Sequence, residues 1–239
     1  MMEKGRALGL SLMPVLMWLF VQCAVVLGFP SIMNWLGSVL SALGADTGGF
    51  YSFLEINDTY CIYILMDALV LIPGVLWFRR LPAREEKKQG GFFGISPGGV
   101  LLLVLAGLAL QLLSNFLLTM IFTAFPELME SYSQVLENLG MYSPTVLSLL
   151  YTAAVAPLAE ELLFRGLTLR ILEEAFPFWA ANLLQALYFG LIHGNLVQGG
   201  YAFGAGMLLG YLVKKKGTLA AGILCHFGVN FSGVILGLL

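Results

Sequence analysis

The stretch TVLSLLYTAAVAPLAEELLFRGLTL, residues 145–169, places a pair of carboxylates inside an apolar segment. The segment has the length of a membrane helix, because a hydrocarbon core of about 30 Å needs about 20 helical residues. Glu160 and Glu161 stand side by side within it, and Arg165 follows. An ionisable side chain at membrane depth costs about 2.5–3.5 kcal/mol on insertion scales, so such groups usually serve a function. The stretch therefore predicts a membrane helix that carries chemistry.

The composition of the whole chain agrees with a membrane protein. Of its 239 residues, 59% are hydrophobic and 11% are charged, and the mean hydropathy is +0.88. Soluble domains carry about 25% charged residues. We therefore expect an all-α, polytopic transmembrane bundle whose surroundings are the lipid bilayer. The net charge is −2, and the absence of a basic surface excludes nucleic acid as a partner.

Seven segments have the length and apolarity of transmembrane helices, and we predict about seven spans. Residues 29–45 are predicted to form an interfacial or re-entrant segment, with an eighth span as the alternative. The predicted spans are residues 7–28, 59–78, 98–124, 145–172, 177–194, 199–213 and 218–238.

The distribution of charge predicts the orientation of these spans. Basic residues gather before the first span, in the loop 79–91, near the end of the fourth span and at 214–216 after the sixth. The intervening loops hold acidic residues and no Lys or Arg. By the positive-inside rule, the N-terminus is then cytoplasmic. The short loops and compact size suggest an integral protein of a bacterial plasma membrane.

The two glutamates are predicted to have different roles. Glu161 and Arg165 are four residues apart on a helix, so they share a face and can form an ion pair. Glu160 is rotated by about 100° from Glu161 and is left for other partners. A carboxylate inside an apolar segment is suited to the role of a general base. Pro157 is expected to kink the helix and to open room beside Glu160.

The chain has two histidines, and each lies in a later apolar segment. His193 ends the fifth predicted span, and His226 is followed one turn later by Asn230. Either histidine taken alone is as well explained by packing or by hydrogen bonding between helices. Their predicted depths, together with that of Glu160, fall within roughly 14–24 Å of the inner membrane face. One shared cavity is therefore expected.

This set of side chains is suited to hydrolysis of an amide. Glu160 and His193 together can deprotonate a water molecule, while His226 and Asn230 can donate to an oxyanion. His193, His226 and Glu160 are also the residue types of a three-ligand zinc site. Their spacing does not separate a zinc site from a site without a cofactor. Asp67 stands alone in the second span, where it is either a packing residue or part of a proton relay.

Three motifs occur in order on the C-terminal segments. EELLFR at 160–165 fits EExxxR, FGLIH at 189–193 fits FxxxH, and HFGVN at 226–230 fits HxxxN. In this order they resemble the CPBP family, the CAAX proteases and bacteriocin-processing (Abi) enzymes, which include the Ras-converting type of CAAX prenyl endopeptidase. The resemblance covers about residues 145–239, so we divide the chain into N-terminal helices and loops, 1–140, and a catalytic core, 141–239.

The resemblance implies an intramembrane endopeptidase. Glu160 takes the place of the family's catalytic glutamate, with His193 beside it. His226 and Asn230 take the places of the residues that stabilise the oxyanion. Glu161 and Arg165 match positions where support of the site by ion pairing is expected. The family has been described both as metalloproteases and as glutamate-dependent enzymes without metal, and the glutamate mechanism is the preferred interpretation. Substrates of the implied kind are prenylated CAAX-type proteins, leader peptides or membrane-protein segments.

Two functions of other classes remain as alternatives. A non-proteolytic bacteriocin-immunity or membrane scaffold protein would have no need of the full set of glutamate, histidine and asparagine side chains. A small transporter with a glutamate and histidine proton relay is disfavoured by the lack of an obvious inverted repeat.

Overall fold

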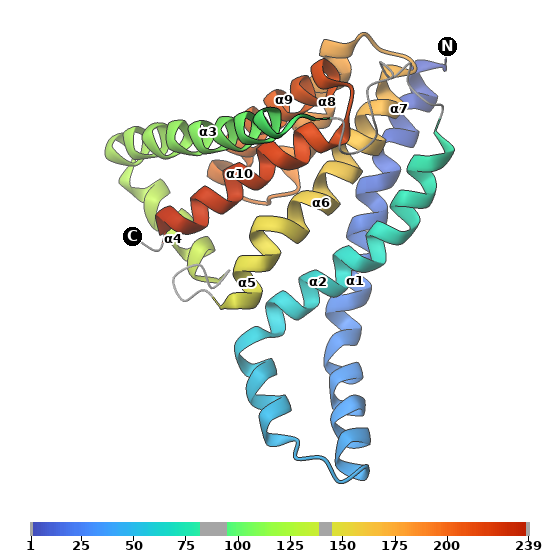
Figure 1. Ribbon diagram of the computed structural model, residues 1–239, viewed down its shortest axis with the longest axis vertical. Coiled ribbons are helices and arrows are strands. Elements are labelled where there is room, and N and C mark those ends of the chain that lie inside the picture. Colours follow the sequence, from blue (N-terminus) through green and yellow to red (C-terminus); the bar gives the residue numbers. More distant parts are fainter. Residues whose placement is uncertain (1, 82–94, 139–144, 238–239) are drawn as a thin grey trace.

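The computed structural model describes residues 2–81, 95–138 and 145–237 and is helical throughout these ranges (Figure 1). The long helices are α1 (Lys4–Ala42), α2 (Gly48–Arg80), α3 (Pro97–Ala124), α9 (Leu196–Lys216) and α10 (Leu219–Gly237). Shorter helices are α4 (Pro126–Asn138), α5 (Val146–Leu150), α6 (Ala156–Glu161), α7 (Leu169–Glu173) and α8 (Phe178–Leu191). The prediction of an all-α, polytopic bundle is confirmed.

Within the described ranges, six helical segments are long and apolar enough to cross a membrane. One of them is the continuous helical segment Val146–Glu173, which contains α5, α6 and α7. The predicted span 177–194 forms only the 14-residue helix α8. At 1.5 Å per residue α8 is about 21 Å long and is shorter than the roughly 30 Å hydrocarbon core.

The prediction for residues 29–45 was wrong. Residues 29–42 continue α1, which is a single helix of 39 residues. Pro30 lies inside this helix without ending it. The second helix likewise begins at Gly48, before the predicted start at 59, and has 33 residues. The two helices are about 58 and 50 Å long, so their far ends extend beyond the rest of the bundle (Figure 1).

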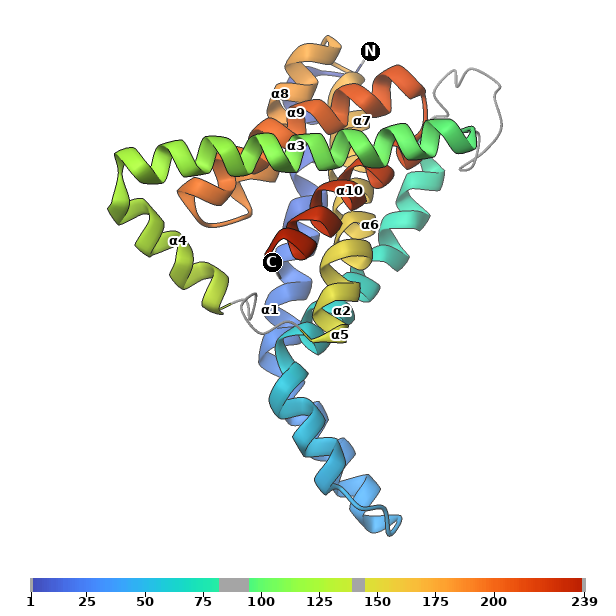
Figure 2. The same ribbon diagram turned by 60° about the vertical axis from the view of Figure 1, so that its left-hand side comes forward.

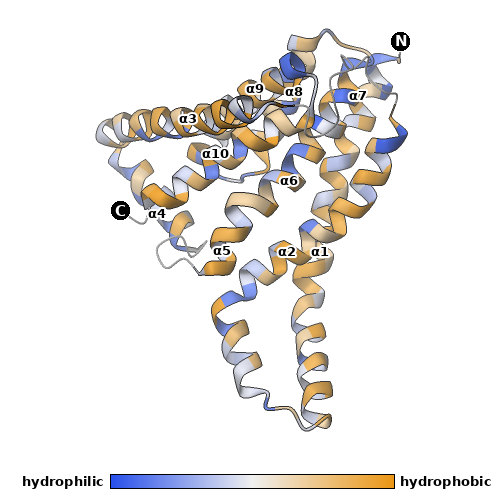
Figure 3. Cartoon of the chain, viewed as in Figure 1, coloured by the Kyte–Doolittle hydropathy of each residue, from blue (hydrophilic) through white to orange (hydrophobic). Residues whose placement is uncertain are grey.

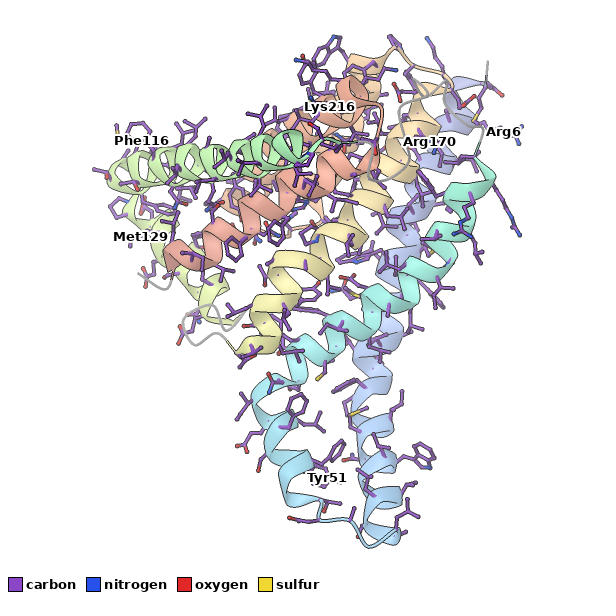
Figure 4. All side chains as sticks on the ribbon, in the orientation of Figure 1. Arg6, Tyr51, Phe116, Met129, Arg170 and Lys216 are labelled. Carbon is purple, nitrogen blue, oxygen red and sulfur yellow. The ribbon has the colours of Figure 1, made fainter. Side chains whose placement is uncertain are left out.

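Basic residues from three helices gather at one end of the molecule. Arg6, Arg170 and Lys216 come from three different helices and lie together at the end opposite Tyr51 (Figure 4). This arrangement agrees with the charge distribution that predicts a cytoplasmic N-terminus. Part of the predicted charged loop 79–91, with Arg84, Lys87 and Lys88, lies outside the described residues.

The surface of the long helices is apolar, as expected of helices in lipid (Figure 3). Large hydrophobic side chains are exposed along α1, α2 and α3, among them Phe20, Ile72 and Phe116. The protein core instead lies where α2, the segment Leu162–Thr168, α8 and α9 meet. It contains Val70, Leu163, Phe164, Leu167, Phe189 and Ala202.

Glycine allows two of the helix pairs to approach closely. A Cβ atom on Gly190 would lie 2.7 Å from the carbonyl oxygen of Gly199, so α8 and α9 meet backbone to backbone. A Cβ atom on Gly107 of α3 would meet the backbone of α10 at Cys225. These contacts fix α9 and α3 on either side of the helices that carry the predicted site.

The helix of the two glutamates is not a regular α-helix. A π-helical turn, Tyr151–Val155, precedes α6, and a second π-helical segment, Leu162–Thr168, follows it. Pro157 is the second residue after the first of these turns. Since proline lacks the N–H of an α-helical hydrogen bond, a widened turn beside it accommodates the missing donor. Irregular turns on both sides thus determine the direction of the Glu160 and Glu161 side chains.

Candidate active site

Glu161 is buried in a charged network. Its Oε1 atom lies 2.8 Å from Nη1 of Arg165, and both side chains are 0% exposed. The same oxygen lies 3.0 Å from Nδ1 of His226, which comes from α10. The predicted ion pair therefore forms, and it also holds one of the two histidines. Because a buried charge is very costly without its partner, this network requires all three side chains.

Further contacts hold the Arg165 side chain in place. Its guanidinium lies over the ring of Phe189, 4.4 Å from the ring centroid. Phe189 in turn contacts both histidine rings edge-on, at centroid distances of 5.0 Å for His193 and 5.9 Å for His226. A cation over an aromatic face is stabilised by the ring quadrupole, more strongly when water is excluded. Phe189 thus packs between the arginine and the two histidines, in the position expected beside His193.

Glu160 faces in a different direction from its neighbour. Its side chain is 24% exposed, and Oε2 lies 3.6 Å from Nε2 of His226. His226 is therefore placed between the two glutamates, with Nδ1 toward Glu161 and Nε2 toward Glu160. Because a carboxylate oxygen accepts hydrogen bonds, each ring nitrogen of His226 faces an acceptor.

His193 lies just after the end of α8, where the chain turns through Gly194 at φ 65°. Its Nδ1 atom lies 2.7 Å from the carbonyl oxygen of Phe189. Because a carbonyl oxygen only accepts, Nδ1 carries the proton, and Nε2 of the neutral ring is left as a proton acceptor. The backbone of the helix thus selects the tautomer that a general base requires.

Asn230 lies one turn after His226 on α10. Its Nδ2 atom donates to the carbonyl oxygen of Thr152 at 2.8 Å. That carbonyl belongs to the π-helical turn ahead of α6. Since an amide nitrogen has two N–H donors, one orients the side chain against this turn and the second is available to another acceptor.

One cavity joins these groups. It has a volume of about 750 Å³, and Glu160, His193, His226 and Asn230 all line it. Binding sites for small ligands typically have volumes of about 300–1,000 Å³. The structure therefore brings together Glu160, His193 and His226, for which a shared cavity was expected, and Asn230 lines the same cavity. Glu161 and Arg165 lie behind them, where they do not line this cavity.

The structure also shows polar residues near the site that sequence reasoning missed. Tyr151 and Thr152 come from the π-helical turn, and Gln111, Ser114 and Asn115 come from α3; all five line the cavity. The signal for the α3 residues was present in the sequence. Polar residues recur at helical spacing within an otherwise apolar span, which indicates a face turned away from lipid.

Asp67 has neighbours that its position in the sequence did not reveal. It is 2% exposed on α2, and the side chains of Trp18 and Tyr151 make polar contacts with it. Glu160 is close enough to interact with it electrostatically. Asp67 therefore lies next to the candidate site, and the two interpretations of it, packing and proton relay, remain predictions.

The zinc alternative needs three ligands that converge on one point. Across residues 2–81, 95–138 and 145–237, no three His, Cys, Asp or Glu side chains are arranged to hold a metal ion. Glu160 and His226 approach each other, but Nδ1 of His193 is directed to the Phe189 carbonyl. The residues proposed as zinc ligands, His193, His226 and Glu160, thus do not form a metal site in this arrangement, and no step is assigned to a metal.

Comparison with known proteins bears on the segment that contains the site. Residues 142–232 match the family model of the type II CAAX prenyl endopeptidases, Rce1-like. This segment is therefore similar to the Rce1-like endopeptidases. The resemblance to the CAAX protease family is thereby confirmed, and its motif residues from Glu160 to Asn230 lie inside the matched range. No curated protein and no solved structure matches the chain.

The Rce1-like segment and the apolar helices together define the class of the protein. It is an integral membrane protein with a segment similar to the CAAX-type intramembrane endopeptidases. A peptide or membrane-protein substrate and a lipid bilayer are its fitting partners. The roles of single residues within the Rce1-like segment are proposals and follow below.

Proposed function

We propose that this protein hydrolyses a peptide bond within or next to the membrane, with Glu160 and His193 activating the water. The observation that carries the proposal is the single cavity lined by Glu160, His193, His226 and Asn230. Glu160, the Nε2 atom of His193 and the donor side chains of His226 and Asn230 share this space, and such a set matches the needs of amide hydrolysis.

In the proposed reaction, water attacks the carbonyl carbon of the scissile bond, and Glu160 accepts a proton from that water. The carbonyl oxygen becomes an oxyanion, which accepts hydrogen bonds from Nε2 of His226 and Nδ2 of Asn230. The C–N bond then breaks, and the proton held by Glu160 or His193 moves to the leaving nitrogen. The products are a carboxylate and an amine, and the reaction needs no oxidant or reductant.

Glu161 and Arg165 act in this proposal as positioning residues. The buried carboxylate of Glu161 holds Nδ1 of His226 at 3.0 Å, so Nε2 points into the cavity. Arg165 balances the charge of Glu161 at 2.8 Å. A donor fixed before the reaction stabilises an oxyanion without a reorganisation cost, which is a large term in catalysis.

We further propose that the N-terminus is cytoplasmic and that the protein lies in a bacterial plasma membrane. Glu160 lies 13 residues before Glu173, where its helical segment ends. This separation corresponds to about 20 Å. His226 lies seven residues after the start of α10, or about 10 Å. The reacting groups would then lie below the basic face, within reach of a substrate held in the membrane.

A cleavage assay with purified protein in liposomes tests this function. The substrates are prenylated CAAX peptides, leader-type peptides and single-span membrane segments, and each is offered with and without a zinc chelator. We expect the wild-type protein to cleave, and the chelator should leave this cleavage unchanged. Cleavage should be abolished in Glu160→Ala, His193→Ala and His226→Ala. Loss of cleavage with the chelator and recovery with zinc would instead establish a metalloprotease. If folded wild-type protein cleaves none of these substrates, the binding or immunity function becomes the better hypothesis.

A further inference from the structure

One face of α3 changes character along its length. The helix is the most apolar of the spans, with a mean hydropathy of 2.3 in its best window. Toward its C-terminal end, however, Gln111, Ser114, Asn115 and Thr119 all line the cavity that contains Glu160. Leu118 and Phe122 line it from the same face. A row of polar groups in a membrane helix is expensive unless the groups have partners or face water.

The earlier part of the same face has a purely structural role. Gly107 lies one turn before Gln111 and meets the backbone of α10 near Cys225 and Val229. Gly228 of α10 in turn meets the backbone of α3 at Val104. The two helices are therefore in close contact at this crossing, whereas the C-terminal end of α3 extends past the end of α10 (Figures 1 and 2). The face becomes polar where it lines the cavity, and its first polar side chain, Gln111, still lies against Gly233 of α10.

The polar side chains form a defined pattern of donors and acceptors. Nε2 of Gln111 donates to Oδ1 of Asn115 at 2.9 Å. This bond leaves the Gln111 carbonyl as an acceptor and the Asn115 amide as a donor, one helical turn apart. If both side-chain amides are flipped, one free acceptor and one free donor still remain. Thr119 donates to the Asn115 backbone at 2.8 Å and keeps its own acceptor capacity.

We infer that this polar face of α3, comprising Gln111, Ser114, Asn115 and Thr119, binds the main chain of an extended polypeptide substrate. The inference rests on the proposed endopeptidase function and adds the substrate class. One residue of an extended chain presents its own N–H and C=O on the same side, and these two groups complement the free acceptor and donor of the Gln111 and Asn115 pair. Successive turns of α3 rise by 5.4 Å, and main-chain groups on one side of a strand repeat at about 6.6–6.8 Å. The helix repeat and the strand repeat are similar enough for the peptide to contact two successive turns of α3.

The same face discriminates against two other occupants. An α-helical substrate has its backbone groups already paired, so it has nothing to offer the α3 amides. An isoprenoid chain carries no hydrogen-bonding group and would leave the amides unpaired. Each buried polar group without a partner is costly. The polar face therefore fits an unwound peptide segment next to the scissile bond rather than the lipid part of a prenylated substrate.

A pair of phenylalanines on α3 provides a matched test by photo-cross-linking. Phe122 lines the cavity, whereas Phe116 on the same helix is 61% exposed and points away from the bundle (Figure 4). Each is replaced by benzoylphenylalanine in a Glu160→Gln background. The probes are a single-span leucine and alanine peptide with a central Gly-Pro break and a farnesylated CAAX tetrapeptide.

We expect the single-span peptide to cross-link at position 122 and not at 116. The double substitution Gln111→Met and Asn115→Leu is expected to lower cross-linking about tenfold. Two hydrogen bonds are lost, and each contributes a factor of about 5 or less. The comparison uses variant protein whose unfolding midpoint is unchanged. Asn115→Gln keeps the donor and is expected to retain most of the signal.

Three outcomes would overturn the inference. They are cross-linking at 122 by the farnesylated peptide alone, no cross-linking at 122 by either probe, and full cross-linking in the folded double variant. Because the readout is binding, it is independent of cleavage. Cross-linking at 122 by a peptide that wild-type protein does not cleave would support the binding face and contradict the proposed hydrolysis. Where cleavage is seen, the double variant should raise KM about tenfold and leave kcat nearly unchanged.

Discussion

The N-terminal hairpin of α1 and α2 and the C-terminal core, residues 146–237, are both built of membrane-length helices but are held by different surroundings. In the most apolar part of each helix, 44% of the residues are buried in Val146–Glu173 and 50% in Leu219–Gly237. The corresponding shares are 17% in α1 and 22% in α2. These two core segments therefore pack against protein over a larger share of their length than the hairpin helices do.

The two regions also differ in the polar groups they bury. The C-terminal core encloses Glu161, Arg165, Asn182, Gln185 and His226. The hairpin contributes Asp67 beside the site, and its far half beyond the bundle carries exposed apolar side chains such as Trp35. Buried polar groups need particular partners, whereas an apolar side chain in lipid does not. Sequence changes should thus have large effects in the core and small effects in the hairpin.

The largest expected effect is on activity and comes from Glu160→Gln. Removal of the proposed general base should lower the cleavage rate about 10²–10⁴-fold. The unfolding midpoint should stay unchanged, because this side chain is partly exposed and lies outside the 2.8 Å pair of Glu161 and Arg165. Cleavage and thermal unfolding in detergent are measured together. The exposed Glu130→Gln serves as a control with wild-type activity, and an active Glu160→Gln variant would remove Glu160 from the mechanism.

The next largest effect is on stability and comes from Arg165→Leu. The change leaves the fully buried Glu161 carboxylate without its cation, which should lower the free energy of unfolding by about 3–5 kcal/mol. Lys214→Ala removes a comparable 2.8 Å contact to Glu173, but Lys214 is 47% exposed, so its cost should be about 1 kcal/mol or less. Equal costs for the two variants in denaturant titrations would contradict the contrast between buried and exposed pairs.

A smaller effect is expected where an N-terminal helix joins the C-terminal core. In Gly107→Ala the new Cβ atom meets the α10 backbone, which should destabilise the protein by about 1–3 kcal/mol. Gly98→Ala on the same helix is the control, since no atom lies within 4 Å of its Cβ position. Thermal unfolding of both variants gives the difference. If Gly107→Ala were as stable as Gly98→Ala, the close crossing of α3 and α10 would not hold.

The smallest effect is expected in the far half of the hairpin. Trp35 is 66% exposed, so Trp35→Ala should change the free energy of unfolding by no more than about 0.5 kcal/mol. Phe189→Ala, by contrast, removes a ring that is 2% exposed and should cost about 3–5 kcal/mol. Chemical denaturation of both variants in the same detergent compares the two regions directly. A large loss of stability in Trp35→Ala would show that the far half of the hairpin has a protein partner.

Much of the site was predictable because its residues are chemically conspicuous in an apolar chain. Two glutamates, an arginine and two histidines at membrane depth have few explanations other than a functional cluster. The pairing of Glu161 with Arg165 followed from their spacing of four residues, and the structure confirms that contact. The link from Glu161 to His226 was not predictable, because 65 residues separate them and only the packing of α10 against α6 brings them together.

The lengths of the helices were less predictable than their presence. Hydropathy ended the first span near residue 28, but α1 continues to Ala42, past Pro30 and through a stretch that includes Ser31, Asn34 and Ser38. Conversely, residues 177–194 read as a full span, whereas α8 ends at Leu191 after 14 residues. Apolar composition reports the environment of a segment, but local backbone geometry decides where a helix ends.

The sequence by itself determined that this chain is a helical membrane protein, and it predicted a glutamate and histidine site of the kind found in CAAX proteases, because charges are tolerated in lipid only where they are needed. Tertiary structure decided which glutamate is enclosed and which faces the cavity, since the π-helical turns around α6 set their directions. It also decided that the polar face of α3 joins the site. That contact depends on Gly107 and Gly228 at the crossing of α3 and α10, and no local pattern in the sequence specifies which helix lies there.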